Sequence, residues 1–100
     1  MDTELTRKVT ESLNQLVDEE TTRRLGELNI VTEVAELQDG SISIRFQPLS
    51  PYSPLSVNMG REIRKAALAV PGVKSVQVEC SGHLMDSLVN RLVNSEPGTK

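Results

Sequence analysis

Hydrophobic residues recur along this chain at two different spacings, one typical of helices and the other typical of strands. In the first stretch they lie three or four positions apart, which predicts one apolar stripe on a helix over residues 3–18. The same spacing returns in residues 54–70 and again in residues 84–92. We therefore expect three amphipathic helices, each with one face directed to a shared core.

Strands are predicted where apolar and polar residues alternate, as they do in residues 41–47 and 76–80. Residues 28–37 are rich in Ile, Val and Thr and predict a further strand, whose irregular phase fits either a bulge or burial on both faces. Asp39 and Gly40 separate the first two strands. Asp-Gly between alternating stretches is a strong hairpin signal, so these two strands should pair antiparallel.

The resulting order of elements is αββαβα, which predicts an α+β fold. A connection that runs from strand to helix to strand within one sheet is right-handed in nearly all known cases, so the third strand should lie parallel to the second. The helices should then cover a shared face of a small mixed three-stranded sheet, as a two-layer sandwich. We expect residues 1–95 to form a single domain and residues 96–100 to form a flexible C-terminal tail.

Composition narrows the class of protein. A chain of 100 residues has room for one modest core and little for a deep enclosed active site, which disfavours an enzyme. Its net charge of -3 and its only two rings, Phe46 and Tyr52, disfavour a nucleic-acid partner. The single cysteine forms no internal disulfide, no stretch approaches the ~20 apolar residues of a membrane span, and the N-terminal residues are polar. We therefore expect a cytoplasmic protein.

The stretch 48–54 contains three prolines and predicts a stiff, shaped loop. Ser53 and Pro54 match a helix start, with the serine as N-cap and the proline at the first helical position. The serine has no neighbouring base in the sequence, because the only histidine is His83, so it is expected to act as a cap rather than as a nucleophile. Tyr52 is the ring that such a loop would expose for a protein contact.

Cys80 and His83 have the spacing of half a zinc site, and Asp86 follows His83 by about one helical turn. A closed zinc site needs four ligands, and the alternation of Val76, Val78 and Cys80 is also typical of a buried strand. Two interpretations therefore stay open, a core cysteine with a surface histidine and a metal site shared across a two-fold dimer.

Two charged groups admit a structural and a functional interpretation. The acidic residues Asp18 and Glu20 favour a solvated helix end, with a cation site or a carboxylate pair as the alternative. Arg61, Arg64 and Lys65 favour a solvated helix face, with a docking patch for an acidic partner as the alternative.

Several short motifs, in their order and spacing, resemble those of the SufT-like domain family, which also includes the PaaD-like proteins and was formerly catalogued as a domain of unknown function. The resemblance covers residues 5–94 and is strongest in four places: a turn at Asp18-Glu19-Glu20, then Leu25-Gly26, Pro51-Tyr52-Ser53-Pro54 and Pro71-Gly72-Val73. Gly82-His83-Leu84-Met85, followed by Val89-Asn90, resembles archaeal members in particular.

This resemblance implies a role in iron-sulfur cluster assembly or delivery, as an adaptor between a cluster source and recipient proteins. Two positions depart from the family pattern, since Ser53 stands where the family has a cysteine and Glu19 replaces the usual proline. The loop keeps the capped helix and the exposed surface that docking needs. It lacks the thiol that would bind a cluster directly.

We therefore expect a non-enzymatic accessory protein without a resident cofactor, acting through residues 49–54 and 54–70 on iron-sulfur assembly proteins or recipient apoproteins. The alternative is a carrier that holds zinc or an iron-sulfur cluster through Cys80 and His83, as a monomer or across a homodimer. Neither nucleic acid nor a membrane is an expected partner. The residues expected to make the partner contacts are Asp18, Glu20, Pro51, Tyr52, Ser53, Pro54, Arg61 and Arg64.

Overall fold

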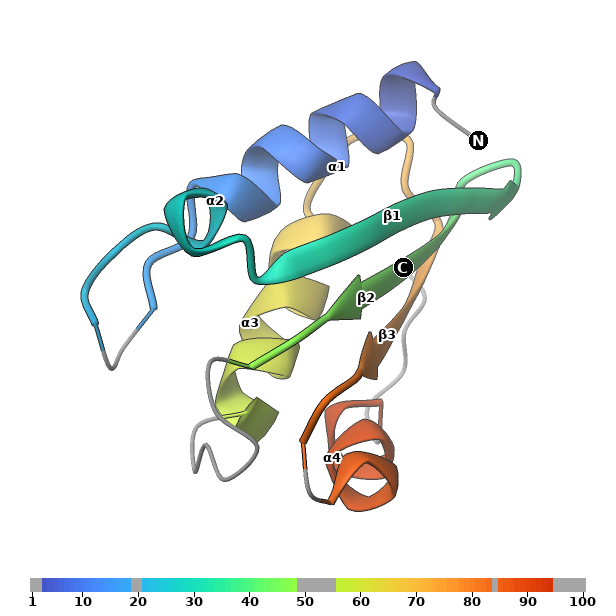
Figure 1. Ribbon diagram of the computed structural model, residues 1–100. Coiled ribbons are helices and arrows are strands. Elements are labelled where there is room, and N and C mark those ends of the chain that lie inside the picture. Colours follow the sequence, from blue (N-terminus) through green and yellow to red (C-terminus); the bar gives the residue numbers. More distant parts are fainter. Residues whose placement is uncertain (1–2, 19–20, 49–55, 84, 95–100) are drawn as a thin grey trace.

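The computed structural model describes residues 3–18, 21–48, 56–83 and 85–94. Figure 1 shows a sheet with helices on one face and a final helix along one edge. The α+β class and the mixed three-stranded sheet are confirmed. The elements in chain order are α1 (Glu4–Asn14), α2 (Leu25–Leu28), β1 (Val31–Gln38), β2 (Ser41–Phe46), α3 (Ser56–Leu68), β3 (Ser75–Cys80) and α4 (Asp86–Val93).

The sheet has the strand order β1-β2-β3, with β1 antiparallel to β2 and β2 parallel to β3. Ile44 at the centre of β2 pairs with Val34 of β1 and with Val78 of β3. The register of β1 shifts between Val31 and Glu33 and again near its other end, so the irregular phase of this strand reflects bulges.

The hairpin between β1 and β2 is held by more than its Asp-Gly turn. Gly40 has φ +81°, a left-handed conformation that glycine adopts without steric cost. The Glu36 carboxylate accepts hydrogen bonds from the Gly40 N–H at 2.9 Å and from the Thr3 hydroxyl at 2.8 Å. The Gly40 hydrogen bond, followed by the Thr3 one, lowers the pKa of Glu36. This carboxylate therefore ties the hairpin to the start of α1.

The core lies between the sheet and helices α1 and α3. Ile42, Ile44 and Phe46 of β2 are almost fully buried, and they cluster with Ile63 of α3 and Leu13 of α1. Burying each such side chain contributes roughly 1.5–3 kcal/mol to folding. The alternation that predicted β2 therefore identifies the face of the sheet that the helices cover.

The first helix ends at Asn14, four residues before the predicted end. The Leu25 N–H donates to the Leu16 carbonyl at 2.8 Å, and Val17 forms an isolated bridge with Arg24. The backbone after Asn14 therefore pairs with residues 24 and 25 and forms a loop instead of continuing the helix. The short helix α2 that follows this loop was not predicted from the sequence pattern. Val17, an apolar residue within the predicted helix 3–18, lies beyond the helix end and is 58% exposed for this reason.

The last helix also differs from its prediction, because it begins at Asp86 rather than at residue 84 and ends at Val93. Val89 and Val93 are buried, whereas Met85, Leu88 and Leu92 are exposed. Leu88, Val89, Leu92 and Val93 form one broad apolar arc, so spacing alone did not identify which part of this arc faces the core.

The free edge of β3 is closed by side chains from α3 and α4 rather than by another strand. The Asn94 carboxamide accepts from the Val78 N–H at 3.1 Å and donates to the Val78 carbonyl at 2.7 Å. The Asn90 carboxamide pairs in the same way with the N–H and the carbonyl of Cys80. The Arg64 guanidinium donates to the Val76 carbonyl at 3.5 Å. Backbone groups of Val76, Val78 and Cys80, whose side chains face the core, are therefore bonded to side chains of other elements.

This arrangement predicts that Asn94→Ala lowers the free energy of unfolding by about 2 kcal/mol, because the peptide groups of Val78 lose both partners. The measurement is equilibrium unfolding in urea. Asn58→Ala is the matched control, since Asn58 is exposed on α3, and its effect should stay within about 0.5 kcal/mol. Equal effects of the two substitutions would contradict a structural role for the Asn94 bonds.

Candidate functional site

The carboxyl ends of the parallel strands β2 and β3 form the candidate site. Phe46 and Cys80 are paired at these ends, and the Ser81 N–H donates to the Phe46 carbonyl at 2.9 Å. Gly82 lies directly against the Gln47 side chain. The segment that leads to the proline-rich loop and the turn that leads to α4 therefore leave the sheet side by side. Ligand sites of open sheets often lie at such ends.

The turn before α4 is organised by a single carboxylate. Asp86 accepts from the His83 N–H at 2.7 Å and from the Gly82 N–H at 3.3 Å. Gly82 has φ +92°, which favours glycine at this position. The imidazole Nδ1 of His83 accepts a hydrogen bond from the Met85 N–H at 2.9 Å. The side chains of Asp86 and His83 thus accept hydrogen bonds from backbone N–H groups and stabilise the turn.

Cys80 is a core residue with 1% of its surface exposed. Burial, followed by the nearby negative charge and hydrogen bond of Asp86, raises the pKa of its thiol to about 12. The thiolate is the form that binds metals, so this environment opposes ligation. Within the described parts of the chain, no three His, Cys, Asp or Glu side chains lie together as a metal site. The metal site at Cys80 and His83 stays a prediction for metal analysis.

The prediction for Arg64 as an exposed contact residue is wrong, because this side chain is buried with 7% exposure. Its Nη1 donates to the Val93 carbonyl at 3.2 Å, at the end of α4. Arg61 remains exposed, and its Nη2 reaches the Leu92 carbonyl at 3.3 Å. The sequence could not indicate this difference, since the acceptors come from a segment about thirty positions away.

The expectation of a solvated helix end at Asp18 is also wrong. Asp18 is 3% exposed, and its carboxylate accepts from the backbone N–H and the hydroxyl of Thr21, both at 2.9 Å. Its own N–H donates to the Arg23 carbonyl at 2.8 Å. Asp18 therefore shapes the loop between α1 and α2. It presents no free carboxylate for a cation.

The remaining predicted site residues lie outside the described part of the chain, and the structure gives no account of them. The predicted Ser53–Pro54 helix start lies there too, and α3 is described from Ser56 onward. These residues are Glu20, Pro51, Tyr52, Ser53 and Pro54.

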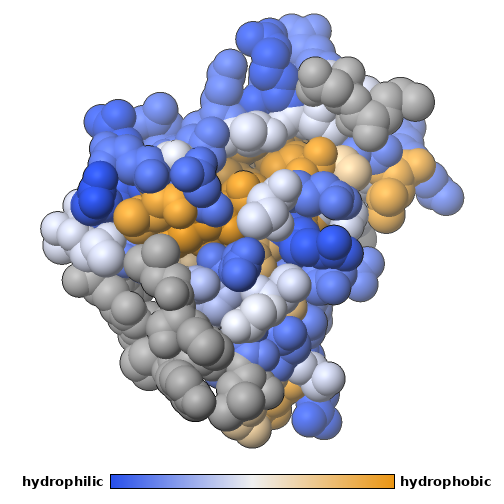
Figure 2. All heavy atoms as spheres, viewed as in Figure 1, coloured by the Kyte–Doolittle hydropathy of each residue, from blue (hydrophilic) through white to orange (hydrophobic). Residues whose placement is uncertain are grey.

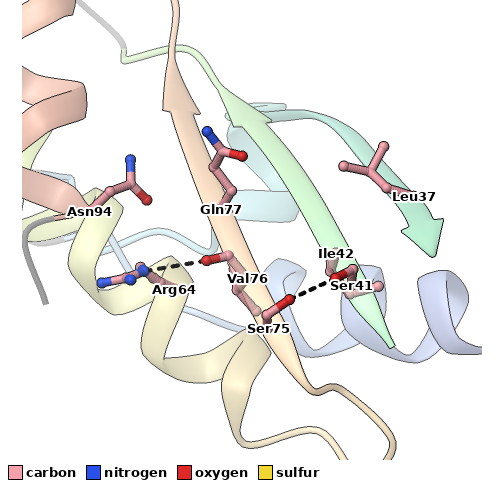
Figure 3. A pocket seen from close by; sticks show the side chains of 8 residues that line it. All are labelled: Leu37, Ser41, Ile42, Arg64, Ser75, Val76, Gln77 and Asn94. Atoms are coloured by element: carbon pink, nitrogen blue, oxygen red, sulfur yellow. Dashed lines mark hydrogen bonds between the residues drawn. The ribbon is translucent and has the colours of Figure 1, made fainter. Parts of the chain in front are cut away.

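An open hollow lies at the opposite end of the sheet, where β2 and β3 begin (Figure 3). Ser41 and Ser75 face each other there, with their hydroxyl oxygens 2.7 Å apart. Arg64 and Asn94 reach its border while bonded to the backbone of β3. The hollow is lined by Leu37, Ser41, Ile42, Arg64, Ser75, Val76, Gln77 and Asn94. This set contains no histidine, cysteine or carboxylate, and therefore no nucleophile with a neighbouring base.

Fold and site together define a small α+β scaffold in which the segment ending at Pro48 and the turn before α4 leave the carboxyl ends of a parallel strand pair. A profile of the iron-sulfur cluster assembly protein family matches residues 6–80, and the chain belongs to this family. No helix in the described ranges is long and apolar enough to span a membrane.

Two further comparisons agree with this assignment. The uncharacterized protein MJ1129 of Methanocaldococcus jannaschii is 23% identical over 70 residues, which cover 70% of this chain and 74% of the relative. The crystal structure of a domain of unknown function, DUF59, from Bacillus anthracis superposes with a TM-score of 0.71 at 19% identity. It covers 77% of this chain and 74% of the other, so the two share a fold.

The environment of Cys80 predicts slow thiol chemistry. A pKa raised from 9.0 to about 12 leaves roughly a thousandfold less thiolate at pH 8 than in the unfolded chain. Modification by iodoacetamide at pH 8 should therefore be at least about 100-fold slower in the native protein than in urea. Because the folded pKa is the higher one, the associated stability is complete below about pH 9 and declines above it. Equal native and unfolded modification rates would contradict this burial.

Proposed function

We propose that this protein is a non-enzymatic accessory factor of iron-sulfur cluster assembly that acts as an adaptor through protein contacts. The family match supports a role in iron-sulfur cluster assembly. The environment of Cys80 supports action through protein contacts rather than through cluster binding. Iron-sulfur clusters are held mainly by thiolates. The only thiol of this chain is buried, protonated and hydrogen-bonded to Asp86. A role through docking therefore fits these residues better than a role through cluster ligation.

The surface proposed for docking comprises residues 49–54 and the exposed face of α3. Arg61 and Lys65 are exposed on this helix together with one carboxylate, Glu62, so the face carries a net positive charge. An acidic region on an assembly protein or a recipient apoprotein would complement this charge. Arg64 is excluded from the surface, since its guanidinium is buried between α3, β3 and α4.

The function can be tested in cells that lack the gene. Complementation with the wild-type protein should restore the activities of iron-sulfur enzymes several-fold and leave an iron-free enzyme unchanged. Tyr52→Ala and Arg61→Glu should both reduce this restoration, because each removes a proposed contact. Lys8→Glu is the matched control, since it reverses an exposed charge on α1 and should restore activity fully.

A second variant separates the adaptor from a cluster carrier. Cys80→Ala should still restore the iron-sulfur enzymes, provided that circular dichroism shows a folded protein. Loss of restoration by a folded Cys80→Ala protein would overturn the adaptor mechanism and favour the carrier. Full restoration by both contact variants would overturn the proposed docking surface.

A further inference from the structure

The exposed side of α4 carries an apolar stripe, which we define as Met85, Leu88 and Leu92. Their side chains are 54%, 36% and 38% exposed, while Val89 on the inner side of the helix is buried. The spacing of three and then four positions places the stripe along one line of the helix. Hydrophobic surface at the lower end of the molecule in Figure 2 lies where Figure 1 shows α4.

Two arginines lie next to this stripe. The Arg61 guanidinium reaches from α3 to the Leu92 carbonyl at 3.3 Å, which places it beside one end of the stripe. Arg91 lies on α4 next to Leu92 and, together with Leu88 and Met85, lines an open hollow. The stripe is thus a narrow apolar strip with one positive charge at its end and another beside it.

One carboxylate, that of Asp86, lines the same hollow. It is oriented by the backbone N–H groups of Gly82 and His83 and by the Cys80 thiol, and it keeps its negative charge. Arg61, Arg91 and Asp86 together carry a net positive charge, which contrasts with the net charge of -3 of the whole chain.

From this combination we infer that the α4 stripe is a docking site for an acidic amphipathic helix of a partner protein. Such a helix would lay its apolar residues, spaced i, i+3 and i+7, on Met85, Leu88 and Leu92. Acidic residues that border that apolar face would meet Arg61 and Arg91. The open hollow beside Leu88 would receive one large apolar side chain of the partner.

Charge disfavours a second copy of this chain as the occupant. An antiparallel pair of α4 helices would bring the arginine border of one copy toward the arginine border of the other, and like charges in contact repel. A single helix of eight residues is also only about 12 Å long, which gives a small area for a stable dimer. An acidic partner avoids this repulsion.

The probe for this inference is a designed amphipathic peptide with leucines at i, i+3 and i+7 and glutamates on both flanks. Nuclear magnetic resonance titration of the full-length protein should shift the signals of α4, with a dissociation constant on the order of 100 µM. Affinity should fall at high salt, because the flanking charges are exposed. A matched peptide with lysines in place of the glutamates should not bind.

Variants of the protein locate the site. Leu88→Glu and Arg91→Glu should each weaken binding of the peptide at least about 10-fold. Leu37→Glu and Lys8→Glu are the matched controls, because they place the same charge on an exposed leucine of β1 and an exposed lysine of α1. Both should bind as the wild type does. Arg91→Glu keeps the test valid if Leu88→Glu disturbs folding.

Three results would overturn the inference. The first is the absence of α4 shifts up to millimolar peptide, and the second is equal binding of the lysine peptide. The third is a dimer in sedimentation experiments that Leu88→Glu dissociates, which would make a second copy the occupant. None of these results changes the expected effect of Tyr52→Ala on the restoration of iron-sulfur enzymes. The α4 docking site and the proposed function can therefore be refuted independently.

Discussion

The free edge of β3 is the constraint on which the rest of the structure depends. A strand that pairs on one side only leaves peptide groups that must be bonded elsewhere, or the edge invites aggregation. Here Asn90 and Asn94 supply the missing partners from α4. A carboxamide carries the same donor and acceptor as a peptide group. Four residues along a helix advance about 6 Å, and two residues along a strand advance about 6.6 Å, so the spacings match.

Closing this edge fixes the position of α4, and several features follow. Cys80 becomes buried beneath the helix, where Asp86 accepts its hydrogen bond. The close approach of α4 to α3 requires a glycine at position 60, since a Cβ there would lie 2.5 Å from a methyl group of Val93. With Val93 turned inward, the apolar residues on the other side of α4 are left at the surface. The exposed stripe on α4 is therefore a consequence of the hydrogen bonds by which this helix covers the free edge of β3.

The two arginines of α3 have different roles, since Arg64 is buried and stabilises the fold whereas Arg61 is exposed at the surface. Arg64 donates to carbonyls of β3 and α4 and is removed from solvent. Arg61, three positions earlier, caps the same end of α4 from the exposed side. Packing thus leaves Arg61 and Lys65 as the exposed cations of α3, on the helix that follows the motif loop.

The sequence by itself determined the helix and strand types, the antiparallel hairpin and the parallel third strand, because these depend on local periodicity, turn residues and crossover handedness. The buried faces of β2 and β3 also followed from alternation. Tertiary structure alone decided the end of α1, the inner face of α4 and the fates of Asp18 and Arg64. Arg64 bonds carbonyls of β3 and α4, and the sequence does not reveal which remote acceptors it will meet. The partner of Asp18 is local, since Thr21 lies three positions away, but the burial of this carboxylate depends on how the loop packs.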